Sequence, residues 1–258
     1  MIGRSPYDEY LQLGRLLDAQ SPLGPPDAHD ELMFITVHQV AELWFKLLLH
    51  ELRDARDLML RGCPGPALTR LRRCHEVERV LIAQFRVLDT MSAHAFAEFR
   101  TALGTASGLQ SVQFREIERV SADRGAGRGP ARAADPPEDE PSLWDAYLGL
   151  LRRSGLDVSS PAGRLRSYAR LAVHGPRGTD PGLHTLAELA ESLVEHDHNW
   201  AVWRLSHALS VERQLGGAHG TGGTPGASFL WSRAQRRFYP ELWRARTAPF
   251  LTPPPPLP

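Results

Sequence analysis

The sequence predicts an all-α protein, and two observations support this prediction. Apolar residues recur every three or four positions over long stretches, which is the spacing of one face of an α-helix. Alternating apolar and polar runs rich in β-branched residues, which are typical of strands, are nearly absent. The chain has 258 residues, enough to bury a sizeable core, and we interpret residues 1–258 as one domain.

Helices are predicted in close succession in the N-terminal half. The first runs from Asp30 to Arg61 and ends at the glycines and prolines of 62–66. Its apolar face carries Phe34, Val37, Ala41, Trp44, Leu48 and Leu52. Further helices are predicted over 67–88, 93–103 and 109–120.

The C-terminal half is predicted to contain a long helix over 183–215 and a last helix over 229–246. Gly, Pro, Arg, Asp and Glu dominate 122–141, so we expect a linker or surface loop there. A second break is expected at 175–178. The proline-rich end, 252–258, is expected to be extended and disordered.

Charge and cysteine content exclude several classes of protein. Thirty basic residues balance thirty acidic ones, which disfavours a nucleic-acid partner. No apolar run approaches the roughly 20 residues of a membrane span, and no signal peptide is visible. The two cysteines, Cys63 and Cys74, are too few for a disulfide framework or a four-thiolate metal site. We therefore expect a cytoplasmic protein with no membrane partner.

Two histidines lie on predicted helix faces rich in apolar residues. His38 is one turn after Phe34, where a core histidine bonded to a backbone carbonyl is the commoner situation. The alternative is a polar group that faces a cofactor or substrate pocket. His207 follows Trp200 and Trp203, so it is a candidate axial haem ligand, although taken alone it fits a core histidine better.

The stretch Glu195-His196-Asp197-His198 has the residue types of a metal site. A Glu-x-x-His pair can bind one iron of a di-iron helical bundle, but that site needs a second copy and further carboxylates, which we do not find. His196 and His198 point about 200° apart on a helix and cannot chelate one ion together. We expect a solvated helix face here.

The glycine-rich run 216–226 lets backbone N–H groups approach a ligand closely. It is not a phosphate-binding loop, because no lysine follows the glycines and no strand precedes them. A flexible connector and a closable lid fit the pattern equally well.

Taken in order, several blocks resemble the tryptophan 2,3-dioxygenase family. The resemblance covers nearly the whole chain except roughly 122–180. The matching blocks are 7–20 (Tyr7-Asp8-Glu9-Tyr10-Leu11 onward), 29–46 (His29-Asp30-Glu31-Leu32-Met33-Phe34 onward, with His38-Gln39), Phe99-Arg100, Ser107-Gly108-Leu109-Gln110-Ser111, His207, Gly220-Thr221-Gly222-Gly223 and Phe238-Tyr239-Pro240-Glu241-Leu242.

The resemblance implies a helical-bundle haem protein of the tryptophan/indoleamine 2,3-dioxygenase type. Such an enzyme uses haem b with ferrous iron and O₂ as co-substrate. It oxidises the indole ring of L-tryptophan to N-formylkynurenine, in tryptophan catabolism through the kynurenine pathway. The resemblance also implies a homotetramer, a dimer of dimers, in which the N-terminal segment enters a neighbouring active site.

The resemblance also assigns roles to individual residues. His207 would be the proximal ligand of the haem iron, and His38 the catalytic distal histidine that binds the indole N–H. Arg100 would bind the substrate carboxylate, because its planar guanidinium suits a bidentate pair. Further substrate contacts would come from Phe34, Phe96, Thr221 and, from the neighbouring subunit, Tyr7, Tyr10 and Leu11. The cofactor would also contact Trp203, Ser107 and Gly108.

Four positions depart from the common family pattern and remove hydroxyls or cations near the substrate. They are Phe96, Phe114, Ser206 and His219. These departures leave open a related haem monooxygenase that forms a 2-oxindole from tryptophan or a methyltryptophan in natural-product biosynthesis. A haem or indole binder without turnover is a third alternative. The retention of His38, Arg100, His207 and Thr221 argues against it.

Overall fold

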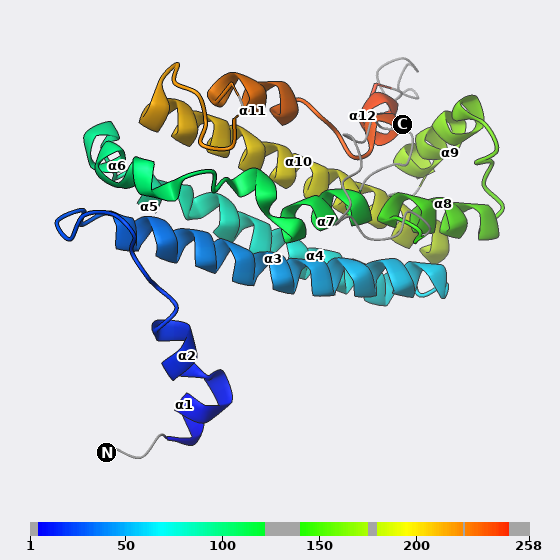
Figure 1. Ribbon diagram of the computed structural model, residues 1–258. Helices are drawn as coiled ribbons and strands as arrows, with labels where there is room; N and C mark the ends of the chain where they lie inside the picture. Colours follow the sequence, from blue (N-terminus) through cyan, green and yellow to red (C-terminus); the bar gives the residue numbers. More distant parts are fainter. Residues whose placement is uncertain (1–4, 122–139, 175–179, 224, 248–258) are drawn as a thin grey trace, which may run out of the picture.

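The computed structural model describes residues 5–121, 140–174, 180–223 and 225–247 (Figure 1). No strand occurs in these ranges, so the all-α prediction is confirmed. The helices are α1 (Pro6–Leu11), α2 (Leu13–Leu17), α3 (Glu31–Leu60), α4 (Pro64–Ala83), α5 (Phe85–Leu88), α6 (Ala93–Arg100), α7 (Val112–Ser121), α8 (Leu143–Arg153), α9 (Pro161–His174), α10 (Pro181–Leu215), α11 (Ala227–Ala234) and α12 (Pro240–Ala245), with short 3₁₀ turns η1 (Thr101–Leu103) and η2 (Gly108–Gln110).

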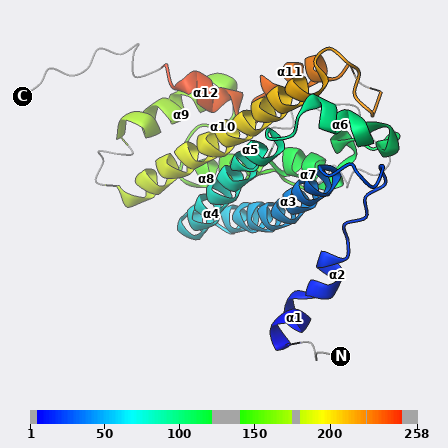
Figure 2. The ribbon, with the colours of Figure 1, turned by 90° about the vertical axis from the view of Figure 1, so that its left-hand side faces the viewer.

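Three long helices, α3, α4 and α10, form the centre of the bundle (Figures 1 and 2). α7 and α8 pack on α3, while α9 and α11 pack on α10. Leu52, Leu71, Leu193 and Trp200 are fully buried between these helices. Burying a side chain of this size stabilises the fold by roughly 1.5–3 kcal/mol. The amphipathic faces of these helices therefore meet in the main core, and a second, smaller cluster contains Ala28, Met91, Phe96 and Phe99.

The boundaries of α3 and α10 agree with the prediction within two residues. The predicted helix over 67–88 is instead two helices, α4 and α5, which meet at Gln84. The helix predicted over 229–246 is wrong, because α11 ends at Ala234 and α12 begins at Pro240. Proline lacks the N–H that a helix interior needs, so it starts a new helix in its first turn.

The sequence reading missed α8 and α9, which lie between the expected linker and the expected second break. α8 begins at a capping box in which Ser142 and Asp145 bond each other's backbone N–H. It buries Leu143 and Tyr147 completely. Most of the expected linker, 122–139, and the whole of 175–178 and 252–258 lie outside the described residues.

The expectation of a solvated face at 195–198 is wrong for His196, whose side chain is fully buried. Its Nδ1 hydrogen-bonds the carboxylate of Glu78, and its Nε2 lies 2.8 Å from Oγ of Ser121. Asn199 donates to the second Glu78 oxygen at 3.0 Å. α10 is packed on more than one side here, so the face expected to meet water meets α4 and α7 instead.

Asp197 is also fully buried, on the side of α10 that faces α12. Its Oδ2 accepts hydrogen bonds from the backbone N–H of Tyr239 at 3.1 Å and from the indole N–H of Trp243 at 2.9 Å. Within the described ranges no group of three or more His, Cys, Asp or Glu residues could hold a metal ion. His196 and Asp197 therefore connect α10 to α4, α7 and α12 by buried hydrogen bonds.

By length and composition alone, α3 could cross a membrane, which the sequence analysis did not expect. Its C-terminal half lies in the core, where Leu48, Leu52 and Met59 are fully buried. The same helix packs against α4, α7 and α8. We interpret it as the central helix of the bundle.

Candidate active site

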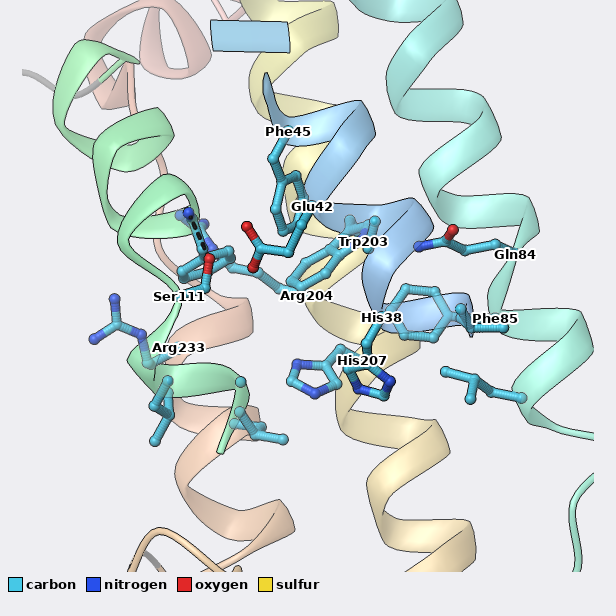
Figure 3. Close-up of a pocket in the computed structure, with 17 residues that line it drawn as sticks. His38, Glu42, Phe45, Gln84, Phe85, Ser111, Trp203, Arg204, His207 and Arg233 are labelled. Carbon is cyan, nitrogen blue, oxygen red and sulfur yellow. Dashed lines mark hydrogen bonds between the residues drawn. The ribbon is translucent and has the colours of Figure 1, made fainter. Parts of the chain in front are cut away.

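A cavity with an empty volume of about 890 Å³, part of it open to solvent, lies between α3, α5, η2, α10 and α11 (Figure 3). Aromatic rings make up much of its wall. The lining residues include Val37, His38, Ala41, Glu42, Phe45, Gln84, Phe85, Leu88, Gly108, Leu109, Ser111, Phe114, Trp203, Arg204, His207, Leu230 and Arg233.

His38 faces this cavity from α3, and its tautomer is fixed by its own helix. Nδ1 lies 2.7 Å from the carbonyl oxygen of Phe34. A carbonyl oxygen only accepts, so Nδ1 carries the proton and Nε2 keeps a lone pair in the neutral ring. Burial lowers the pKa of His38, against the opposing effects of the Phe34 carbonyl and Glu42. The ring is therefore neutral at physiological pH.

His207 reaches the same cavity from α10 and lies among aromatic rings. The centroids of Trp203 and Phe85 are 5.3 Å and 6.0 Å from that of His207. Burial, helped by the nearby His38, lowers the pKa of His207 to about 4. Neither ring nitrogen has a hydrogen-bond partner in the described part of the chain. A neutral, unpaired imidazole is the form that binds a metal ion.

Three phenylalanines extend the aromatic wall beyond His38. The ring of Phe34 lies 4.2 Å from that of His38 between centroids, and it also contacts Phe96 at 5.7 Å and Phe99 at 5.4 Å. Phe96 and Phe99 are buried and meet edge to face. This side of the site is apolar, and Phe96 offers no hydroxyl group there.

Arg100, at the end of α6, has a side chain that is only partly paired. Its Nη2 donates to the carbonyl oxygen of His219, but its Nε is buried and has no hydrogen-bond partner among the residues that the structure describes. A buried donor without a partner costs free energy unless a ligand supplies an acceptor. A bound carboxylate would satisfy this group.

The glycine-rich run packs onto the turn that follows α6. Oγ1 of Thr221 donates to the carbonyl oxygen of Ala106 at 2.6 Å. Gly222 lies so close to Ser107 that a Cβ at this glycine would be 2.8 Å from the Cβ of Ser107. Arg100, Thr221 and Ser107 are thereby gathered at one end of the site.

The structure brings most of the predicted site residues together. His38, His207, Trp203 and Gly108 line one cavity, and the aromatic pair Phe34 and Phe96 adjoins it. Arg100, Ser107 and Thr221 meet at the glycine-rich run.

The N-terminal residues predicted for the site lie elsewhere in the single chain. Tyr7, Tyr10 and Leu11 belong to α1 and are 66%, 86% and 41% exposed. α1 and α2 project from the bundle in both ribbon views (Figures 1 and 2).

The sequence reading missed a charged cluster in the cavity wall. Nη2 of Arg204 lies 2.7 Å from one oxygen of Glu118, and Nη2 of Arg233 lies 2.6 Å from the other. Arg204 is buried and extends from α10 one turn before His207. Because 29 of the 30 basic residues are arginine, no single arginine was conspicuous in the sequence.

One lining residue, Glu42, belongs to a polar pair that the sequence did not suggest. Nε2 of Gln113 donates to the backbone oxygen of Glu42 at 2.8 Å and to its carboxylate at 2.7 Å. Figure 3 shows the Glu42 carboxylate extending into the space between Phe45 and Arg204. This pair holds α7 against α3 at the cavity.

The residues present fit a haem. Phe45, Phe85, Phe114 and Trp203 wall the cavity, and His207 supplies a neutral imidazole that has no hydrogen-bond partner among the described residues. An apolar wall with one neutral imidazole is the usual environment of a haem with a single protein ligand.

Comparisons with known proteins point to one family. A family model described as tryptophan 2,3-dioxygenase matches residues 2–131 and 177–248. The tryptophan 2,3-dioxygenase of Nocardioides sp. is 45% identical over 255 residues, covering 93% of each chain. That of Saccharopolyspora erythraea is 40% identical over 259 residues, covering 93% of this chain and 92% of its own.

A third relative, the tryptophan 2,3-dioxygenase of Caulobacter vibrioides, is 38% identical over 261 residues, covering 93% of this chain and 97% of its own. The fold and the cavity with its two histidines define an all-α enzyme. The chain belongs to the tryptophan 2,3-dioxygenase family. The family model skips 132–176, within the segment where the sequence resemblance is lost.

Proposed function

We propose that this protein is a haem-dependent oxygenase that inserts both atoms of O₂ into the indole ring of L-tryptophan and forms N-formylkynurenine. One observation carries the proposal: His38 from α3 and His207 from α10 line the same cavity, and both have a lowered pKa. Of two neutral imidazoles in one apolar cavity, one can bind the metal ion and the other can bind the substrate.

His207 holds haem b as its only protein ligand, and the rings of Trp203 and Phe85 fix the imidazole in place. Ser107 and Gly108 contact the edge of the cofactor that lies near the glycine-rich run. When bound, the haem supplies the ferrous iron needed for chemistry with O₂.

His38 orients the substrate. Because Nδ1 is occupied by the Phe34 carbonyl, Nε2 is free to accept a hydrogen bond from the indole N–H. Phe34 packs against the indole ring, and the surrounding phenylalanines exclude water. Holding the ring in one place supplies much of the rate enhancement expected of such a site.

Arg100 and Thr221 bind the amino-acid end of tryptophan. The support for Arg100 is its buried, unpaired Nε, which points to a missing acceptor. Thr221 lies on the glycine-rich run that already rests on the turn beside Arg100. Phe96 contributes only apolar contact there.

The active unit in this proposal is a cytoplasmic homotetramer, a dimer of dimers, in which Tyr7, Tyr10 and Leu11 enter the site of a neighbouring subunit. The support is the exposure of these apolar residues on a helix that projects from the bundle (Figure 1). Cys63 and Cys74 are free thiols, which suits a reducing compartment.

An oxindole-forming monooxygenase is not favoured, because the relatives reported above are named as dioxygenases. Replacement of His207 by alanine tests the cofactor assignment. We expect the variant to lose haem, or to regain the haem absorption spectrum when imidazole is added. Full haem content with an unchanged spectrum would contradict the assignment. His38→Ala is the matched control and should retain haem.

A further inference from the structure

The segment that joins α2 to α3 is fastened to α3 at two points. The first is Gln39, which follows the distal His38 directly. Its Nε2 donates to the carbonyl oxygen of Ala19 at 2.8 Å, and its Oε1 accepts from Nε2 of Gln20 at 2.6 Å. The amide of Gln39 therefore hydrogen-bonds both the backbone of Ala19 and the side chain of Gln20.

The second point is Glu31, at the start of α3. Its carboxylate accepts hydrogen bonds from the backbone N–H groups of Leu23 and Gly24, each at 2.8 Å. Glu31 is only 1% exposed, so these charge-assisted bonds are shielded from water. Gly24 also packs closely against α6: a Cβ at this position would lie 2.7 Å from the Cβ of Phe99.

Between these points the chain has little slack. Eight residues of α3 separate Glu31 from Gln39, a rise of about 12 Å at 1.5 Å per residue. Five residues take the chain from Ala19 to Gly24, and they span at most about 17 Å when fully extended. This strap, residues 19–24, therefore follows α3 closely, and its N-terminal end, from which α2 and α1 extend, lies at Gln39.

The strap also contacts the wall of the candidate active site. Gly24 lies close to Phe99, the ring of Phe99 lies 5.4 Å from that of Phe34, and the ring of Phe34 lies 4.2 Å from that of His38. The strap therefore meets the aromatic wall at its Gly24 end, whereas Gln39 holds the other end, at Ala19 and Gln20.

We infer that Gln39 and Glu31 are positioning residues that hold the strap on α3, so that α1 can deliver Tyr10 to the substrate site of a second copy of this chain. This inference rests on the proposed exchange of the N-terminal segment. Neither residue touches the cavity, and both act through the strap.

The test compares Gln39→Ala with Thr36→Ala in the full-length, haem-loaded protein. Thr36 is an exposed residue of the same helix, and its hydroxyl bonds only Leu32 of its own helix. Gln39→Ala should raise KM for tryptophan about tenfold, the loss expected for one or two hydrogen bonds. The value of kcat and the haem spectrum should be unchanged, because docked α1 binds ground state and transition state alike. Gly24→Ala should act in the same direction.

A double-mutant cycle with Tyr10→Ala separates delivery of α1 from a purely structural role. If Gln39 acts by presenting Tyr10, the two substitutions are non-additive in KM. Additive effects, or a Gln39→Ala variant that behaves like Thr36→Ala, would overturn the inference while the exchange stands. An unchanged KM in Tyr10→Ala would overturn the exchange itself, and the inference with it.

If Gln39→Ala does not fold, Gln39→Glu replaces it in the cycle. The glutamate keeps an acceptor for Gln20 but loses the donor to Ala19. The KM of Gln39→Glu should therefore lie between the KM of the wild type and that of Gly24→Ala. A value equal to that of the wild type would again contradict the inference.

Discussion

Gly222 and Ser107 approach each other so closely that a Cβ at position 222 would lie 2.8 Å from the Cβ of Ser107 and 2.9 Å from its Oγ. The contact holds the glycine-rich run on the turn beside Arg100. It also keeps Thr221 within 2.6 Å of the Ala106 carbonyl.

Gly222→Ala should therefore lift the glycine-rich run and raise KM for tryptophan. Overpacking of a close contact typically costs about 1–3 kcal/mol, which corresponds to a five- to hundredfold change at roughly 1.4 kcal/mol per decade. Gly217→Ala is the matched control, because nothing lies within 4 Å of a Cβ there. Steady-state kinetics decide between them, and equal KM values for the two variants would contradict the prediction.

The pH dependence of catalysis should report His38. The proposed role needs the lone pair on Nε2, so only the neutral ring binds the indole N–H. Burial lowers the pKa of His38 from its usual 6.5, so the neutral form is complete above pH 6.5 and is lost as the pH falls through the lowered value. We expect kcat/KM to be level above pH 6.5 and to fall on the acid side. An acid limb with a midpoint above 6.5, or one that persists in His38→Ala, would contradict this role.

Arg100 should determine whether the enzyme distinguishes tryptophan from tryptamine, which lacks the carboxylate. Loss of one partner of a buried ion pair costs about 3–5 kcal/mol, or roughly 10² to 4 × 10³ in kcat/KM. Arg100→Ala should show this loss with tryptophan and little change with tryptamine, which should be a poor substrate of both enzymes. Equal turnover of the two compounds by the wild type would remove the role from Arg100.

The buried Glu78–His196 pair should contribute to stability and not to the reaction. His196→Ala leaves the Glu78 carboxylate buried with Asn199 as its remaining partner, and loss of a hydrogen-bond partner from a buried group typically costs about 1–3 kcal/mol. Glu195→Gln, one residue away and paired only at the surface with Arg79, should cost less than about 1 kcal/mol. Urea unfolding of both variants tests this contrast, and similar midpoints would show that the buried pair is not needed.

The long helices could be predicted from the sequence because each has one continuous apolar face. The same reasoning missed α8, although the pair Ser142 and Asp145 at capping-box spacing marks its start. The linker-like composition of 122–141 gives no sign of the amphipathic stretch that follows it. The single helix expected over 229–246 is two helices, because Pro240 begins a new helix.

The site was predicted in part because its residues stand in recognisable motifs. The resemblance located His38, Arg100, His207 and Thr221, and the structure brings them around one cavity and the run beside it. The cluster of Arg204, Glu118 and Arg233 could not be found in this way, because its partners lie far apart in sequence and only tertiary packing joins them. Burial of His196 and Asp197 was missed for a related reason: periodicity does not reveal how many sides of a helix are packed.

The fate of the oxygen atoms tests the central claim most directly. The haem-loaded, reduced protein is incubated with L-tryptophan and ¹⁸O₂, and the product is analysed by mass spectrometry. We predict a ring-opened product, N-formylkynurenine, that carries two labelled oxygen atoms. A ring-intact product with one labelled atom would contradict the account and identify the protein as an oxindole-forming monooxygenase.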